Sequence, residues 1–306
     1  MQSSALAAAR RCGDRREESR AENALGSATA RMGVHDQAQR HHERALELAR
    51  DAGDRMLQAA ALNNLGVLHR LMGFLRKLHL DFGAALDLCR AEGDEQRACI
   101  ALGNLGDNLV QLGEYDAART YIDEAHDVSI AVGNSHLQAW ARRCRASILE
   151  ASGDPASALA VAQLAIESAR RGGDRLIECE AVETMALAHV TLGDHERAGE
   201  LFATAHDIAR ELGDHGMIVD TLEGRGRALA ATDPGSAIDL LGQAHTLARR
   251  HGMRLREAKA CLALADVHEK AGDAVAARDR LENALRLCEE IDDPRAETIR
   301  ARLAAA

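Results

Sequence analysis

Repetition with a period of 40 residues constrains this chain more than any other feature. A first series consists of Gly-Asp dipeptides at 13–14, 53–54, 93–94, 173–174 and 213–214, with Gly133-Asn134 in the one gap. A second series of single glycines has the same period: Gly33, Gly73, Gly113, Gly153 and Gly193. Glycine accepts the left-handed conformation that ends a helix, and Asp or Asn caps the next helix by accepting from free backbone N–H groups. A fixed period of this length predicts a solenoid of helix–turn–helix units.

The spacing predicts seven helix pairs with an incomplete repeat at each end. The expected pairs, numbered as repeats 1 to 7, are 15–31 with 35–51, 55–71 with 75–91, 95–111 with 115–131, 135–151 with 155–171, 175–191 with 195–211, 215–231 with 234–250, and 254–270 with 274–290. We therefore expect one solenoid domain over 1–306, with partial repeats at 1–11 and 294–306. The half-helices at both ends indicate a piece of a larger protein.

Composition and charge exclude several classes of protein. Only 3 Pro and 2% aromatic residues accompany abundant Ala, Leu, Arg and Glu, which is typical of an all-helical chain. A net charge of −10 without a basic, aromatic-interleaved patch argues against direct nucleic-acid binding. No apolar stretch is long enough for a signal peptide or a membrane span, so we expect a cytoplasmic protein without a membrane partner. The 7 cysteines form no CxxC pair and are predicted to be reduced core residues.

The second helices carry a repeated pattern of small and large apolar residues. One position holds alanine in six repeats: Ala38, Ala118, Ala158, Ala198, Ala237 and Ala277. Seven residues later, a second position holds alanine in all seven repeats, and a larger residue stands between the two positions in most of them: Phe82, Ile122, Phe202, Leu241 and Leu281. Small residues on one face permit close helix contact, so this stripe is predicted to be the core.

These motifs resemble those of a known family. The first helices contain Leu62-x-x-Leu65-Gly66 and Leu102-x-x-Leu105-Gly106, and the alanine stripe follows in the second helices. The chain therefore resembles, over its whole length, the tetratricopeptide repeat family in its longer form of roughly 40 residues. It is similar to the C-terminal arrays of bacterial signalling ATPases and antibiotic-pathway transcription regulators. The resemblance implies an all-α, right-handed superhelical solenoid whose first helices line a concave groove for peptides or partner proteins.

No arrangement of residues in the sequence predicts catalysis. The chain lacks a phosphate-binding GxxxxGK[ST] loop, and its 14 histidines form no HExxH or other metal pattern. Acidic pairs such as Glu289-Glu290 are explained by solvated helix ends and caps. We therefore predict a protein that is not an enzyme and has no cofactor and no metal site.

The resemblance implies that ten residues face the groove or its edge: Asn23, Asn63, Asn64, Arg70, Asn104, Trp140, Arg143, Glu180, Glu183 and Glu223. A row of asparagines offers donors and acceptors to the backbone of an extended peptide, or else it satisfies polar groups of neighbouring repeats. The single tryptophan is either a binding anchor or packs between repeats 3 and 4. The charged residues either orient a ligand or form ion pairs between repeats.

Repeat 2 has more apolar residues than a single helix layer can bury. Phe74, Leu75, Leu78 and Leu80 fall partly at places that are polar in other repeats. An exposed apolar patch usually marks an interface, so we predict self-association or contact with a missing domain here. The alternative is a local shift that buries these side chains.

Two functions from different classes agree with the sequence. The first is a non-enzymatic interaction and sensor module within a larger bacterial transcriptional or signalling regulator. The alternative is a self-contained regulator that binds a signalling peptide in its concave groove.

Overall fold

A computed structural model describes residues 2–305 of the chain, and this part consists of sixteen helices without a strand. The helices are α1 (Gln2–Cys12), α2 (Arg15–Arg31), α3 (His35–Asp51), α4 (Arg55–Met72), α5 (Leu75–Glu92), α6 (Glu95–Leu112), α7 (Tyr115–Val132), α8 (Ser135–Ala151), α9 (Pro155–Gly172), α10 (Arg175–Thr191), α11 (His195–Leu212), α12 (His215–Leu229), α13 (Pro234–Arg250), α14 (Arg254–Lys270), α15 (Ala274–Glu290) and α16 (Arg295–Ala305). The predicted helix pairs are confirmed, and their ends lie within two residues of the predicted ones.

The repeated Gly-Asp dipeptides end one helix and begin the next, as the sequence predicts. Gly53 has a φ of 64°, and Asp54 accepts a hydrogen bond of 3.1 Å from the backbone N–H of Leu57. The last turn differs, because Asp292 takes the left-handed conformation with a φ of 55°. Local caps of this kind fix where each helix starts and stops.

The alanine stripe of the second helices is the core, as predicted. The larger residues within it are almost completely buried, including Phe82 and Phe202 at 0% exposure. Phe82 lies against Gly66 of the preceding first helix, where an added Cβ would stand 2.6 Å from the ring. Phe202 lies against Gly224 of the following first helix, where an added Cβ would stand 2.2 Å from the ring. The glycines therefore make room for a large neighbour.

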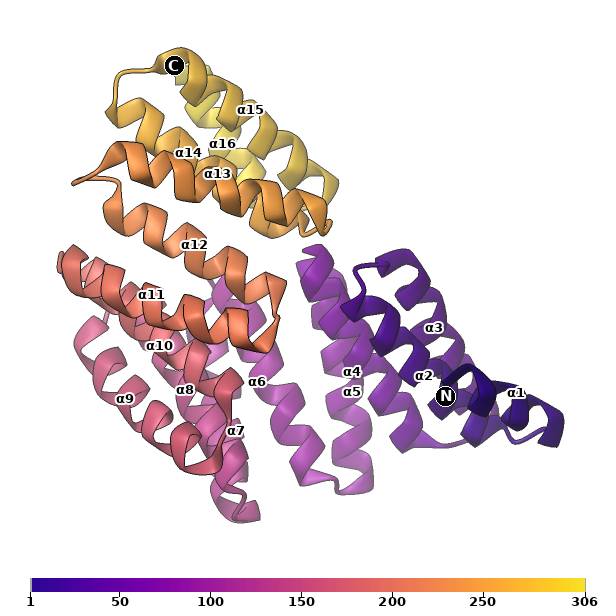
Figure 1. The fold of residues 1–306 in the computed structure, drawn as a ribbon. Coiled ribbons are helices and arrows are strands. Elements are labelled where there is room, and N and C mark those ends of the chain that lie inside the picture. Colours follow the sequence, from indigo (N-terminus) through magenta and orange to yellow (C-terminus); the bar gives the residue numbers. More distant parts are fainter. Residues whose placement is uncertain (1, 306) are drawn as a thin grey trace.

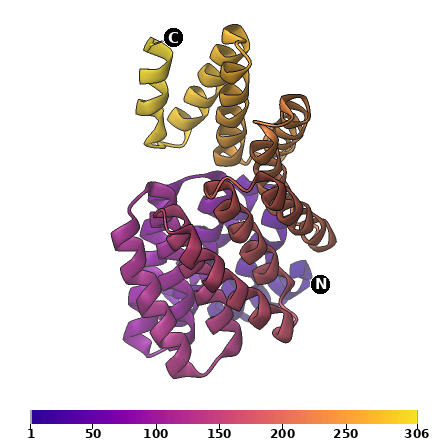
Figure 2. The same ribbon diagram turned by 90° about the vertical axis from the view of Figure 1, so that its left-hand side faces the viewer.

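The first helices of the repeats form the inner layer of the solenoid. Along the array, α6 packs directly on α8, α8 on α10, α10 on α12 and α12 on α14, whereas the second helices pack on the first helices of their own and the next repeat. Figures 1 and 2 show this stacked arrangement as a continuous curved array. The first helices therefore line the concave side, as the resemblance implies.

The curvature brings the last repeats back to the first ones. Figure 1 shows α13 and α14 near the ends of α4 and α5, and α14 contacts α4. Gly73 is buried at this contact, where an added Cβ would stand 2.9 Å from Leu255 and 3.0 Å from Ile291. We call this contact of repeats 1 and 2 with repeats 5 to 7 the seam.

The seam corrects the prediction for repeat 2. Leu75 and Leu78 are 4% and 1% exposed and share one apolar cluster with Leu255 and Ile291. Phe74 is half-buried beside this cluster, and only Leu80 is well exposed, at 71%. The expected contiguous exposed patch is therefore wrong for Leu75 and Leu78, because the chain's own last repeats and the core cover them. An interface at Leu80 stays a prediction.

Candidate ligand-binding groove

Charged side chains of successive first helices meet in pairs on the concave side. Asp107 of α6 pairs with Arg143 of α8, and Asp220 of α12 pairs with Arg256 of α14. Both pairs are separated by 36 residues in the sequence. Because the repeat is 40 residues long, the partner at 36 residues lies on the next first helix, about one helical turn before the position equivalent to that of the first residue. Arg256 was missed in the sequence because no single repeat shows the spacing, although a search for opposite charges at this interval would find it.

Arg143 is the centre of the first group. Its guanidinium donates to Asp107 Oδ1 at 3.1 Å and Oδ2 at 2.7 Å, and its Nε lies 3.3 Å from Glu180 Oε2. The side chain is buried, at 9% exposure. Burial disfavours the charge of Arg143, but the nearby Asp107 and Glu180 carboxylates keep its pKa well above the usual value. Arg143 thus neutralises two carboxylates between neighbouring repeats.

Trp140 lies beside Arg143, whose guanidinium carbon is 5.9 Å from the centre of the indole ring. The ring is half-buried on α6, and an added Cβ at Gly103 would stand 2.0 Å from it. Trp140 therefore packs between repeats 3 and 4. Its use as a binding anchor stays a prediction.

Glu183 differs from its neighbours because no cation pairs with it within residues 2–305. Burial, followed by the charges of Asp220 and Glu180, raises the pKa of Glu183 to about 8. Burial also raises the pKa of Glu180 and of Glu223, although Arg227 approaches Glu223 at 3.4 Å. Around neutral pH, Glu183 is therefore largely protonated, and a cationic group placed there would favour release of this proton.

We expect the substitution Glu183→Gln to stabilise the protein at high pH. A carboxyl group whose pKa is raised in the folded state binds its proton more tightly there than in the unfolded chain, so its contribution becomes unfavourable as the pH rises from about 4.5 to about 8. Because the side chain is partly exposed and screened, we expect a gain of about 2 kcal/mol at pH 9 and little at pH 5. Urea unfolding at both pH values measures it.

Glu196→Gln is the matched control, since Glu196 is exposed on α11. Its effect on the free energy of unfolding should be small at both pH values. An equal effect of Glu183→Gln at pH 5 and pH 9 would contradict the raised pKa.

The asparagines of the predicted row have two different environments. Asn64 Nδ2 donates to Asn23 Oδ1 at 3.0 Å, so these two are linked between repeats. Asn63 and Asn104 are half-buried, and the described part of the chain gives their side chains no hydrogen bond. Arg70 is exposed at the end of α4. Asn23 and Asn64 therefore satisfy each other between neighbouring repeats. The side-chain amides of Asn63 and Asn104 have no hydrogen bond within residues 2–305.

His42 joins the asparagine pair and was not predicted as a site residue. Its Nδ1 lies 2.7 Å from Asn23 Oδ1, and the side chain is only 1% exposed. An added Cβ at Gly26 would stand 2.6 Å from its ring, so the missing side chain of Gly26 makes room for it. Burial, followed by the charge of His41, lowers the pKa of His42 to about 4. The ring is therefore neutral at physiological pH.

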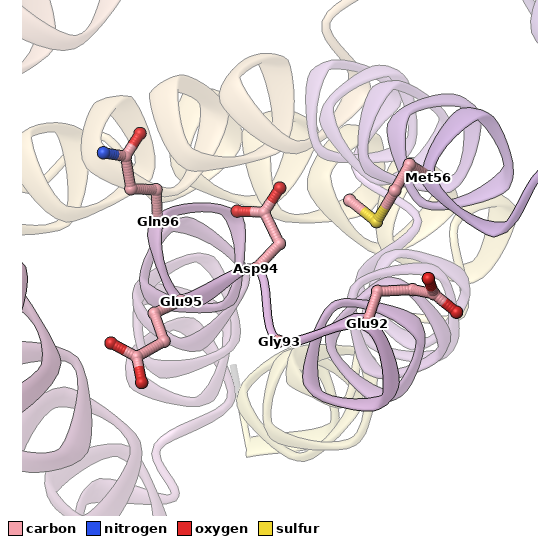
Figure 3. A pocket seen from close by; sticks show the side chains of 6 residues that line it. All are labelled: Met56, Glu92, Gly93, Asp94, Glu95 and Gln96. Carbon is pink, nitrogen blue, oxygen red and sulfur yellow. The ribbon is translucent and has the colours of Figure 1, made fainter.

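Hollows indent the surface at two places that concern the site. The first, of about 500 Å³, lies at the turn between α5 and α6 and is shown in Figure 3. Glu92 and Glu95 point away from each other there, and Asp94 is occupied as the cap of α6. Nothing converges on a ligand in this hollow. The second, of about 390 Å³, lies at the seam and contains Asn64 and His42.

Other kinds of site have no support within residues 2–305. This part of the chain holds no group of three His, Cys, Asp or Glu side chains placed to bind a metal ion. None of its helices combines the length and apolarity needed to cross a membrane.

A solenoid of helix pairs with a polar concave side defines a class of repeat proteins whose inner surface is available for binding. The sequence profile of the tetratricopeptide repeat family matches residues 4–76, 96–171 and 178–250. The chain belongs to this family. No curated protein matches it by sequence.

Several solved structures share the fold at low sequence identity. A Rap protein complexed with competence and sporulation factor has a TM-score of 0.76 and 14% identity, with 90% of this chain and 76% of that chain covered. The Rap conjugation gene regulator of plasmid pLS20, in complex with the Phr* peptide, has a TM-score of 0.72 and 17% identity over 90% of this chain and 74% of that one. A signal transduction ATPase with a tetratricopeptide repeat sensor from Pyrococcus horikoshii has a TM-score of 0.55 and 15% identity over 88% and 41%.

Proposed function

We propose that this chain is a non-enzymatic regulatory module that binds an extended signalling peptide along its concave side. The fold supports this proposal, since two of the similar structures hold a peptide or a signalling factor. We place the protein in the cytoplasm, because six of its seven cysteines are buried free thiols. Its ligand in this proposal is a peptide or protein and not a nucleic acid.

One observation carries the proposal furthest. Three of the first helices, α4, α6 and α10, present polar groups that find no partner within residues 2–305: the amides of Asn63 and Asn104 and the carboxyl group of Glu183. Amides can pair with the backbone of an extended peptide without reading its side chains. The ion pairs of Arg143 with Asp107 and Glu180 link α8 to α6 and α10, the helices that carry Asn104 and Glu183.

Selection from a random library of short peptides on the immobilised protein tests this function. We expect enriched peptides whose affinity falls roughly fivefold to a hundredfold in Asn104→Ala, since loss of an amide leaves a buried peptide group without its partner. The melting temperature should change little, because Asn104 makes no side-chain hydrogen bond in the described chain. Asn64→Ala should lower the melting temperature, because Asn64 bonds to Asn23.

Two results would count against peptide binding in the groove. One is the absence of any enriched peptide. The other is an undiminished affinity of Asn104→Ala for the peptides that the wild type selects. Hydrolysis of acetyl phosphate by the purified chain would oppose the non-enzymatic part of the proposal, which matters because one similar fold is that of aspartyl phosphate phosphatase F from Bacillus subtilis.

A second candidate is the sensor array of a larger signalling regulator. It is favoured by the similarity to the Pyrococcus horikoshii ATPase. That similarity covers 88% of this chain but only 41% of the ATPase chain. A reading frame that encodes a nucleotide-binding domain next to these repeats would favour this candidate. In that case the exposed Leu80 of repeat 2 becomes a candidate contact for the neighbouring domain.

A further inference from the structure

The seam contains the second hollow, which has walls from distant parts of the chain. One wall comes from repeats 1 and 2, on α2, α3 and α4. The other comes from the turn between α11 and α12 and the turn between α13 and α14. We call this hollow the seam cavity, and its volume of about 390 Å³ lies within the range of small-molecule sites.

Direct contacts hold the two walls together next to the seam cavity. His35 Nε2 lies 2.9 Å from the carbonyl oxygen of His251, across 216 residues of sequence. The ring of His251 stacks on that of His215, with centroids 4.1 Å apart. These contacts join the two walls beside the cavity, and both walls line it, so a molecule inside it would touch both ends of the array.

Two residues of the first wall, His42 and Asn64, offer hydrogen-bond acceptors. His42 Nδ1 faces the acceptor Asn23 Oδ1 at 2.7 Å, so the neutral ring carries its proton on Nδ1 and has an accepting Nε2. Asn64 donates its Nδ2 to the same oxygen, which leaves Asn64 Oδ1 to accept. His42 and Asn64 both line the cavity. This part of the wall can therefore accept a hydrogen bond from an N–H or O–H donor.

The remainder of the wall is mainly apolar, and its two charged residues, Arg31 and Asp214, have opposite charges. Val67, Leu68, Leu71, Leu212 and Met253 line the cavity. Burial lowers the pKa of His251, which favours its neutral form, and the carboxylate of Asp214 already caps α12 by accepting from Met217. An uncharged molecule thus matches the wall better than an ion.

We propose that the seam cavity binds a small uncharged molecule with an apolar body and an N–H or O–H donor at one end. When bound, this molecule contacts repeats 1 and 2 on one side and repeats 5 to 7 on the other. A molecule that binds only when the two walls of the seam are in contact stabilises this closed state by mass action. The molecule therefore holds the solenoid closed, independently of a peptide in the groove.

Indole and benzofuran provide a matched pair of probes, since they have the same shape and only indole has an N–H donor. For a ligand of this size we expect indole to bind with a dissociation constant of about 1 mM. Benzofuran should bind roughly threefold to tenfold more weakly, because it cannot donate to His42 or Asn64. Saturation-transfer nuclear magnetic resonance titrations measure both.

Two variants locate the site. Ala30→Phe fills the cavity from α2 and should abolish indole binding, whereas Arg20→Phe adds the same ring to an exposed position of α2 and should leave it unchanged. Amide hydrogen exchange around Gly73 and Leu255 should slow by about tenfold with indole at ten times its dissociation constant. Melting curves verify that both variants fold.

The proposal is overturned if indole fails to bind at about 10 mM, tenfold above the expected constant. Equal binding of indole and benzofuran, or full binding by a folded Ala30→Phe variant, would also overturn it. Displacement of indole by peptides selected on the groove would show that the cavity is a part of the peptide site. Failure to find such peptides leaves this test unaffected, since its probes are defined molecules.

Discussion

Replacement of Arg143 by alanine should destabilise the protein by about 4 kcal/mol. The substitution leaves Asp107 and Glu180 without their shared cation, and breaking a buried pair on one side typically costs about 3–5 kcal/mol. The guanidinium of Arg143 also lies over the ring of Trp140, so that contact is lost as well. Urea unfolding at neutral pH measures the effect.

Arg145→Ala is the control for Arg143→Ala, because Arg145 is exposed on the same helix. It should change the free energy of unfolding by less than about 0.5 kcal/mol. Asp107→Asn combined with Arg143→Ala should recover part of the lost stability, since it removes one of the two stranded charges. If Arg143→Ala were no more harmful than Arg145→Ala, the charged group would not hold the inner helices together.

The sequence was sufficient for the helices and the core because both depend on local features. Each Gly-Asp dipeptide fixes a turn through its own backbone, as at Gly53 and Asp54, without reference to distant residues. The stripe around Phe82 and Phe202 repeats with the helices, so burial follows from periodicity. The second helix of repeat 6 begins at Pro234, 39 residues after the start of the previous second helix at His195, and this departure of one residue from the period did not disturb the relation.

The seam could not be predicted in the same way. Closure depends on small rotations that add up from repeat to repeat, and no single position encodes that sum. The sequence therefore showed surplus apolar residues at Leu75 and Leu78 but not what covers them. Gly73 belongs to the regular glycine series, yet it is also the point where Leu255 approaches.

The candidate groove was only partly predictable for a related reason. A residue type shows what a side chain can bind, but its partner depends on the position of the next helix. Asn63 and Asn64 are neighbours in sequence, but only Asn64 reaches Asn23. Likewise, Arg143 was expected to face a ligand or an ion pair, and the structure gives it Asp107 and Glu180 as partners. Opposite charges 36 residues apart are the sequence signal for the pair of Arg143 and Asp107, whereas Asn64 and Asn23 are 41 residues apart.

Two glycines in adjacent helices should respond in opposite directions to the same substitution. Gly224 of α12 lies against Phe202, and a Cβ there would stand 2.2 Å from a ring that is completely buried. Because the ring has no space to move, Gly224→Ala should destabilise the protein by about 3 kcal/mol. Gly242 of α13 has no atom within 4 Å of the corresponding position, so Gly242→Ala should stabilise it by up to about 1 kcal/mol through helix propensity.

A smaller partner should reduce the harm of Gly224→Ala. In the Phe202→Leu background, the added methyl group at Gly224 has a shorter side chain against it, so the two substitutions should be non-additive, with a coupling energy of about 1–2 kcal/mol in the favourable direction. Phe202→Leu alone should cost stability, since it leaves a cavity in the core of repeats 5 and 6. Urea unfolding of the four proteins in this cycle measures the coupling. If the two effects were simply additive, the solenoid would accommodate the methyl group by moving α12 away from α11. The close contact between Gly224 and Phe202 would then not set the spacing of these two helices.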